Sequence, residues 1–139
     1  MEQRGARMRY EGNKSEENKK LSILIVDRNE VSNVLEKDLS CIGHRVLVAE
    51  CYSDALKMLT ETDCDLIVMD VNLPDGDGIE MISKIREIAG DINVITMTDN
   101  SNRDIEKRAR ENRIMYYVIK PLDFNEIKSL INHLSNKKQ

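Results

Sequence analysis

The chain has 139 residues, about the length of one ordinary globular domain. Hydrophobic residues make up 40% of it and charged residues 33%, so we expect a compact core beneath a charged surface. A net charge of −4 argues against a domain that binds duplex nucleic acid, because such domains usually carry a basic surface. No apolar run approaches the roughly 20 residues that cross a bilayer, and the N-terminus lacks an apolar signal segment. We therefore expect a cytoplasmic protein that binds neither nucleic acid nor membrane.

The charge pattern separates residues 1–20 from the rest of the chain. This segment contains many basic and acidic side chains but almost no apolar ones, so it cannot bury enough surface to offset the entropy lost on ordering. We predict a flexible polar tail over residues 1–20, a single domain over residues 21–135, and a short C-terminal tail over residues 136–139.

Five short aliphatic runs predict five β-strands, and the stretches between them have the apolar spacing of amphipathic helices. Strands alternating with helices predict an α/β fold with a five-stranded parallel, doubly wound sheet in the flavodoxin-like order 2-1-3-4-5 and five helices. Asp123 or Asn125 is expected to cap the last helix. One face of that helix carries Ile127, Leu130, Ile131 and Leu134. The predicted strands are residues 21–26, 45–49, 66–69, 93–97 and 115–119.

Polar side chains stand at the ends of four predicted strands: Asp27, Asp70, Thr98 and Lys120. Because ligands of such sheets bind outside the carboxyl ends of the strands, we expect these groups around one crevice. A carboxylate can attack phosphorus, and Asp27 and Asp70 also offer the oxygen ligands that Mg²⁺ prefers. Lys120 and Thr98 can hold the oxygens of a transferring phosphoryl group. Pro121 allows a cis peptide bond after Lys120.

Four segments of the sequence resemble the receiver domain of bacterial two-component response regulators. The resemblance covers residues 21 to about 135, and the motifs occur in the family's order and approximate spacing. The most specific of them contains the Pro-Asp-Gly-x-Gly turn after the third predicted strand. The segments are ILIVD at 23–27, VMDVNLPDGDG at 68–78, VITMT at 94–98 and YVIKP at 117–121.

The resemblance implies a phosphoacceptor, a metal site and a switch. Asp70 would accept a phosphoryl group from a histidine of a sensor histidine kinase or phosphotransfer protein. Mg²⁺ would be held by Asp27, Asp70 and the backbone carbonyl of Asn72, and Thr98 and Tyr117 match the family's switch pair. An output protein, or a second copy of the chain, would bind the face of the fourth helix, fifth strand and fifth helix. No enzymatic activity is expected beyond self-phosphorylation from a small phosphodonor and slow autodephosphorylation.

Two residues beside the expected site depart from the family. Arg28 stands where most members have a second acid, and a guanidinium cannot ligate a cation, so we expect weakened Mg²⁺ binding. Alternatively, Arg28 stabilises the phosphoryl group itself or points to solvent. Asp99 follows Thr98 at a position that is normally small. Its carboxylate should hinder an incoming phosphate unless Arg28 pairs with it, which would partly close the crevice.

Two functions therefore remain open. The first is a stand-alone phosphoacceptor that signals through protein contacts, and the alternative is a phosphorylation-independent pseudo-receiver. The chain ends at Gln139, soon after the last helix, so we expect no output domain, although an excised domain of a longer regulator would have the same sequence. In the fourth predicted helix, residues 102–113, only Ile105 and Ala109 are apolar. We expect this helix to be weakly anchored and its basic face to suit an acidic partner.

Overall fold

The computed structural model describes residues 19–28 and 30–137 of the chain. Two compact units are defined: Ser22–Leu122 forms one, and Met1–Leu21 with Asp123–Gln139 forms the other. The tail predicted over residues 1–20 lies outside the described residues except at Lys19 and Lys20, and remains a prediction. Among the helices of the described residues, none is long and apolar enough to cross a membrane.

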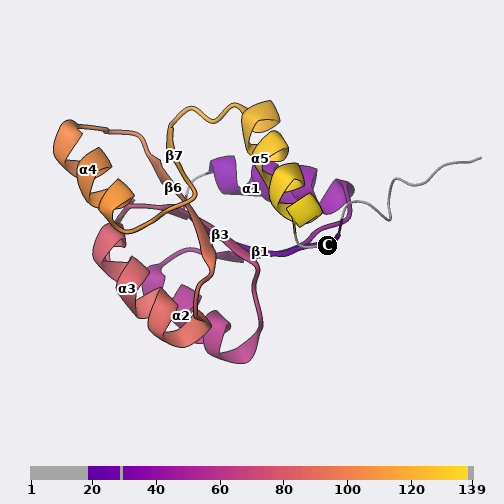
Figure 1. Cartoon of the computed structure of the whole chain (residues 1–139), viewed down its shortest axis with the longest axis horizontal. Coiled ribbons are helices and arrows are strands. Elements are labelled where there is room, and N and C mark those ends of the chain that lie inside the picture. The colour runs from indigo at the N-terminus through magenta and orange to yellow at the C-terminus, as the bar shows by residue number, and fades with distance from the viewer. Residues whose placement is uncertain (1–18, 29, 138–139) are drawn as a thin grey trace, which may run out of the picture. The chain divides into compact units, whose positions relative to one another are not determined.

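A five-stranded parallel sheet forms the centre of Ser22–Leu122 (Figure 1). Its strand order is β2-β1-β3-β6-β7, which confirms the predicted order 2-1-3-4-5 once only the strands of this sheet are counted. The predicted strand positions are also confirmed, to within one residue at every end. The strands are β1 (Ser22–Val26), β2 (Arg45–Ala49), β3 (Leu66–Asp70), β6 (Asn93–Thr98) and β7 (Tyr116–Ile119).

The central strand β3 is buried along its whole length, as its continuous apolar run predicts. Both of its edges are paired, with β1 on one side and β6 on the other. The register aligns the carboxyl ends: Val26 lies opposite Met69, and Asp70 lies opposite Met97. Polar residues that end these strands are thereby brought to one edge of the sheet.

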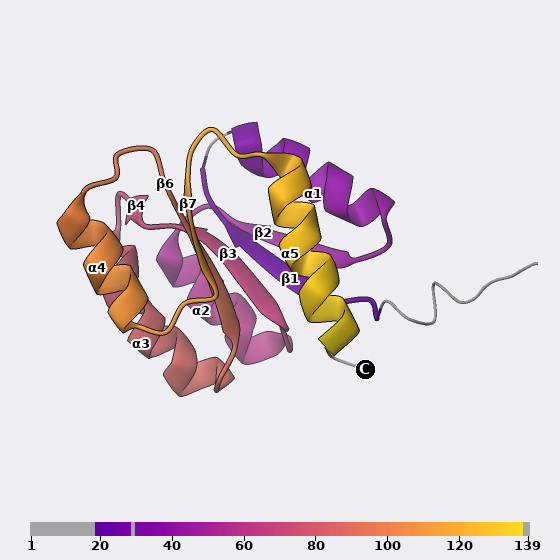
Figure 2. The ribbon, with the colours of Figure 1, turned by 45° about the horizontal axis from the view of Figure 1, so that its top comes forward.

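Helices cover both faces of the sheet (Figures 1 and 2). Helix α1 (Glu30–Cys41) lies on one face, and α2 (Tyr52–Glu61) and α3 (Gly78–Ala89) lie on the other. Apolar residues of α2 and α3 form one buried cluster with alternate residues of β1, β3 and β6, because successive side chains of a strand point to opposite faces. This cluster includes Leu24, Val26, Ala55, Leu59, Ile67, Met69, Ile82, Ile85 and Val94.

A short antiparallel hairpin between β3 and α3 is absent from our predictions. It consists of β4 (Asn72–Leu73) and β5 (Gly76–Asp77), and Asn72 lies opposite Asp77 in its register. Strands of two residues are too short to carry an alternating pattern, so the sequence signals only the turn between them. The hairpin matters because it directly follows Asp70.

The start of α2 is capped by the turn of this hairpin. Cys51 at the N-cap makes no side-chain cap hydrogen bond. Instead, the carboxylate of Asp75 accepts hydrogen bonds from the backbone N–H groups of Tyr52 and Ser53, both at 3.2 Å. A residue more than twenty positions along the chain thus satisfies the exposed donors of the helix and ties the hairpin to α2.

Helix α5 (Phe124–Lys137) belongs to the second unit and continues beyond residue 135, where we expected the domain to end. Asp123 is confirmed as its cap, since Asp123 Oδ1 accepts hydrogen bonds from the N–H groups of Asn125 at 2.9 Å and Glu126 at 3.3 Å. Ile127 and Ile131 are fully buried, in agreement with the predicted apolar face.

Candidate functional site

Three charged side chains meet at the carboxyl edge of the sheet. The ammonium Nζ of Lys120 lies 3.1 Å from Asp27 Oδ2 and 2.9 Å from Asp70 Oδ2. The three side chains are almost completely buried: 8% of the Lys120 side chain, none of Asp27 and 6% of Asp70 is exposed to solvent. Asp27 follows β1, Asp70 ends β3, and Lys120 follows β7, so the parallel sheet alone brings them together. The peptide bond between Lys120 and Pro121 is cis.

The buried triad has one positive and two negative charges. Burial raises the pKa of Asp70 above its ordinary value, despite opposing hydrogen bonds from the Asn72 N–H group and Lys120. For Lys120, burial acts to lower the pKa, but the hydrogen bonds to Asp70 and Asp27 outweigh it and raise that pKa. The two carboxylates thus favour the charged form of Lys120, and they share this one ammonium group.

Thr98 and Asn72 complete the rim of the site. The backbone N–H of Asn72 donates to Asp70 Oδ1 at 2.8 Å, while Lys120 binds Oδ2, so both oxygens of the Asp70 carboxylate are held. The side-chain amide of Asn72 donates to Thr98 Oγ1 at 3.1 Å, and the N–H of Asn100 donates to the same oxygen at 3.1 Å. The predicted site residues at 27, 70, 72, 98 and 120 are thus gathered at one edge.

Tyr117 lies away from these charges. Its side chain is 8% exposed and belongs to a small buried cluster with Val71, Ile79 and Ala109, the last of which lies on α4 (Arg103–Glu111). Its hydroxyl is 2.6 Å from the Ser101 hydroxyl in the loop before α4. The ring therefore connects β7 with α4, while its polar end contacts the loop that follows Thr98.

The ion pair hypothesised between Arg28 and Asp99 is not present in the part of the chain that the structure describes. Both residues are exposed. Arg28 instead borders a cavity of about 370 Å³ together with Glu50, Asp54 and Asp75. These carboxylates give the guanidinium a nearby acidic surface on the other side of the site, so the crevice is not closed by an Arg28–Asp99 contact.

Tyr52 is a site residue that our sequence reasoning missed. Its hydroxyl donates to the backbone carbonyl of Asp70 at 2.7 Å, and it accepts from the N–H of Leu73 at 3.3 Å. Burial, together with the nearby carboxylates, raises the pKa of its phenol far above the ordinary value, so the hydroxyl remains a neutral donor. An aromatic residue at the start of a helix is an ordinary core signal, and nothing local in the sequence points to Asp70.

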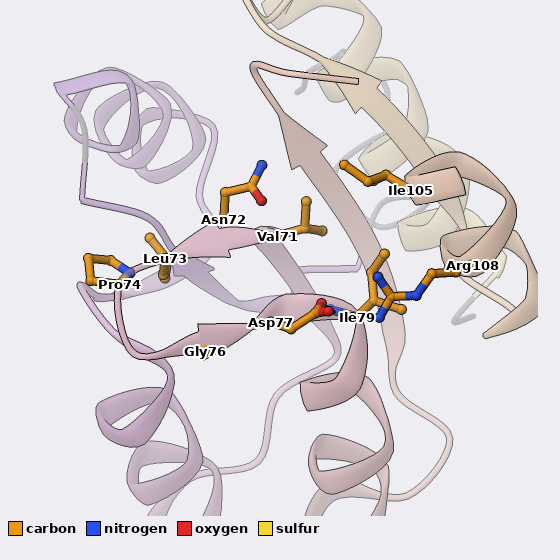
Figure 3. A pocket seen from close by; sticks show the side chains of 9 residues that line it. All are labelled: Val71, Asn72, Leu73, Pro74, Gly76, Asp77, Ile79, Ile105 and Arg108. Carbon is orange, nitrogen blue, oxygen red and sulfur yellow. Dashed lines mark hydrogen bonds and ion pairs between the residues drawn. The ribbon is translucent and has the colours of Figure 1, made fainter. Parts of the chain in front are cut away.

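A cavity of about 550 Å³ lies beside the site, between the β4–β5 hairpin and α4 (Figure 3). Figure 3 shows the side chains of Asp77 and Arg108 pointing toward one another at its wall, where they form an ion pair at 2.7 Å. Asn72 also lines this cavity, so the hairpin that carries Asn72 faces α4 across it. The lining residues are Val71, Asn72, Leu73, Pro74, Gly76, Asp77, Ile79, Ile105 and Arg108.

The family model of the response regulator receiver domain matches residues 23–132, which is most of the chain. The chain belongs to this family. Receiver domains are signalling domains of two-component systems rather than enzymes, they generally bind Mg²⁺, and they interact with histidine kinases. Our expectation from the four sequence motifs is thereby confirmed at the level of the family.

Two curated relatives illustrate the similarity. The DNA-binding transcriptional regulator NtrC of Azospirillum brasilense is 28% identical over 116 residues, covering 83% of this chain and 24% of the regulator. The transcriptional regulatory protein ZraR of Klebsiella oxytoca is 33% identical over 109 residues, covering 77% of this chain and 24% of the regulator. The receiver domain described here thus spans about a quarter of the length of these relatives.

Solved structures agree with the fold. The beryllofluoride-activated NtrC4 receiver domain dimer has a TM-score of 0.78 and 28% identity, covering 85% of this chain and 98% of the other. A two-component response regulator from Clostridium difficile has a TM-score of 0.81 and 23% identity, covering 86% and 99%. The second comparison shows the receiver fold alone.

Proposed function

We propose that Asp70 accepts a phosphoryl group from a phosphohistidine of a sensor histidine kinase or phosphotransfer protein. One observation carries the proposal: Lys120 Nζ lies between the carboxylates of Asp70 and Asp27 at a nearly dry edge of the sheet. This arrangement holds a nucleophile, a cation for the phosphoryl oxygens and a second acid within one site. Other proteins would then bind the chain in its phosphorylated form.

The transfer exchanges one bond to phosphorus for another. An Asp70 carboxylate oxygen forms the new O–P bond while the N–P bond of the phosphohistidine breaks. The leaving ring nitrogen keeps the electron pair, and the imidazole departs neutral because its other nitrogen carries a proton. Lys120 would exchange its contact with Asp70 for a phosphoryl oxygen, and the Thr98 hydroxyl would donate a hydrogen bond to another.

The donor set of the site fits Mg²⁺. Asp27 and Asp70 would supply two carboxylates and the Asn72 carbonyl a third oxygen, which are the hard oxygen ligands that Mg²⁺ prefers. No group of three or more His, Cys, Asp or Glu side chains that could hold a metal ion occurs among the described residues. Bound Mg²⁺ would supply positive charge beside the phosphoryl oxygens. Arg28, exposed next to Asp27, would weaken that binding by charge repulsion.

We also propose Thr98 and Tyr117 as the switch pair. Thr98 Oγ1 now accepts two hydrogen bonds, one of them from the Asn72 side chain. A phosphoryl group on Asp70 would draw the Thr98 hydroxyl toward itself. This movement would strain the loop that contains Ser101, whose hydroxyl is hydrogen-bonded to the Tyr117 hydroxyl. Because the Tyr117 ring packs against Ala109, the change would reach α4. The predicted output face also includes α5, and that part stays a prediction.

A phosphorylation-independent pseudo-receiver is the second candidate. The observations that favour it are Arg28 in place of the second acid and the exposed Asp99 carboxylate directly after Thr98. In that case the chain would bind its partner in one fixed conformation. Binding of a phosphoryl mimic separates the two candidates, because a pseudo-receiver would have no affinity for it.

Intact mass after incubation with acetyl phosphate and Mg²⁺ tests the main proposal. We expect one phosphoryl adduct on the wild type and none on Asp70→Asn, which keeps the size of the side chain but removes its nucleophilic charge. Asp91→Asn is the matched control, because Asp91 is exposed on the loop before β6. Its adduct should equal that of the wild type.

Beryllium fluoride binding, measured by calorimetry, guards against rapid hydrolysis of the adduct. A wild type that forms no adduct and binds no beryllium fluoride at saturating Mg²⁺ would exclude the phosphoacceptor function. The variant Arg28→Asp then tests whether the missing second acid causes this loss of phosphorylation. If this variant gains both the adduct and a Mg²⁺ affinity roughly tenfold or more above wild type, the missing carboxylate is responsible.

A further inference from the structure

The hydroxyl of Tyr52 contacts the backbone on both sides of Asn72. It donates to the carbonyl of Asp70 at 2.7 Å and accepts from the N–H of Leu73 at 3.3 Å. Between these two contacts lies the segment that directs the Asp70 carboxylate and the Asn72 carbonyl. One side chain from α2 therefore fixes the course of the backbone that carries two of the proposed Mg²⁺ ligands.

Tyr52 is itself held firmly. Its side chain is 2% exposed within the cluster beneath β1 and β3, and its backbone N–H donates to Asp75 Oδ1 at 3.2 Å. A Cβ atom at Gly78 would lie only 2.6 Å from the Tyr52 hydroxyl and 2.6 Å from Val71 Cα. Only glycine leaves room for this close approach of the first residue of α3 to the Tyr52 hydroxyl and to the backbone at Val71.

We propose that Tyr52 is a positioning residue for the phosphoacceptor site. Its hydroxyl holds the Asp70 carbonyl and the Leu73 N–H, so that the Asp70 carboxylate and the Asn72 carbonyl would be able to hold the same ion. Tyr52 itself would touch neither the ion nor the phosphoryl group. The proposal rests on the proposed function of Asp70, and it adds α2 to the elements that determine the affinity of the site.

Tyr52→Phe is the direct test, because it removes the hydroxyl and keeps the buried ring. Loss of an orienting partner behind a metal ligand typically costs 10- to 100-fold in affinity or activity. We expect the Mg²⁺ dissociation constant, measured by calorimetry, to rise about tenfold or more. Phosphorylation by acetyl phosphate should slow as well. The amide resonance of Asn72, whose N–H donates to Asp70 Oδ1, should shift in the absence of Mg²⁺.

Leu59→Ala is the control for a merely structural effect. Leu59 lies on the same helix and in the same buried cluster, but its aliphatic side chain cannot form a hydrogen bond to the hairpin. This variant should lower the melting temperature while the Mg²⁺ dissociation constant and the Asn72 resonance stay at wild-type values. Tyr52→Phe that is folded, with wild-type Mg²⁺ affinity and an unshifted Asn72 resonance, would overturn the proposal.

The same measurements separate this proposal from that on Asp70. If the wild type is phosphorylated and Tyr52→Phe behaves identically, only the role of Tyr52 fails. If the wild type binds neither Mg²⁺ nor beryllium fluoride, the phosphoacceptor function fails and the role of Tyr52 fails with it.

Discussion

At the scale of single residues, two threonines of β6 differ although they lie on the same face of one strand. Thr96 and Thr98 are both fully buried. Thr98 Oγ1 accepts hydrogen bonds from Asn72 and Asn100, whereas Thr96 Oγ1 has no hydrogen-bond partner among the described residues. An unpaired buried hydroxyl costs free energy, while a paired one contributes to stability. The same substitution should therefore have opposite effects at the two positions.

Thr96→Val is expected to raise the free energy of unfolding by about 1 kcal/mol, because it removes the unpaired hydroxyl without changing the size of the side chain. Thr98→Val should lower it by about 1 kcal/mol, since two donors lose their acceptor. Urea denaturation followed by circular dichroism measures both. A Thr96→Val variant that is clearly less stable than the wild type would show that this hydroxyl has a partner.

At the scale of elements, α4 is held to α3 by polar contacts as well as by a small apolar cluster. Ala109 is the only residue of α4 that is buried, and Ile105 is half-buried. Arg108 pairs with Asp77 at the start of α3, and Arg86 near the end of α3 donates to the backbone carbonyls of Asn112 and Arg113, the second at 3.0 Å. The prediction of a weakly anchored helix thus agrees with its burial, and polar contacts near both ends of α3 set how easily α4 shifts.

Arg108→Gln should loosen α4. Amide hydrogen exchange in α4 at pH 7 is expected to accelerate roughly two- to fivefold, the effect of losing one partly exposed ion pair. Arg110→Gln is the control, because Arg110 pairs with Glu106 within the same helix at 2.8 Å. Exchange that is equally fast in both variants would show that the Asp77 contact does not hold the helix.

The effect of Arg108→Gln on stability should also depend on pH. Burial acts to raise the pKa of Asp77, but the hydrogen bonds from Arg108 and the Ile79 N–H outweigh it and lower that pKa. A lowered carboxyl pKa means that the pair stabilises the fold above the unfolded value near 4 and loses this effect as the pH falls through the folded value. The difference from the wild type should thus be constant between about pH 7 and 5 and shrink below about pH 4.

At the scale of the whole molecule, every proposed site residue lies within Ser22–Leu122. The other unit contains the short segment before β1 as well as α5, and the Ser135 hydroxyl donates to the Lys19 carbonyl within it. Leu21, at the end of that segment, is 1% exposed. The composition of residues 1–18 offers little that could be buried, so the boundary that matters for stability should fall just before Lys19.

Removal of residues 1–18 is therefore expected to change the free energy of unfolding by less than about 0.5 kcal/mol and to leave the phosphoryl adduct intact. Leu21→Ala in the full chain should cost about 2 to 5 kcal/mol, because it empties a buried leucine site. Urea denaturation compares the two. A large loss of stability on removing residues 1–18 would contradict the predicted tail.

Most of the fold followed from the sequence because its signals are local and repeat along the chain. The five aliphatic runs predicted the sheet and its strand order, and the position of Asp27, Asp70, Thr98 and Lys120 after strands predicted their gathering at one edge. Asp123, one of two residues predicted to cap the last helix, does so, and this could be predicted because capping acts on the next turn of the same helix. The motifs identified the family because each of them is a short run of consecutive residues.

Tertiary structure alone decided the contacts between side chains that are distant in sequence. Three contacts each join different elements of the fold. They are the ion pairs of Lys120 with two acids, the capping of α2 by Asp75, and the hydrogen bond from the Tyr52 hydroxyl to the Asp70 carbonyl. The hypothesised Arg28–Asp99 pair is absent among the described residues for this reason: Arg28 follows β1 and Asp99 follows β6, and β3 lies between these two strands. The exposed Arg28 instead borders a cavity that is also lined by other acids. Periodicity fixes which residues share a face, whereas the direction of a side chain depends on packing that no local pattern encodes.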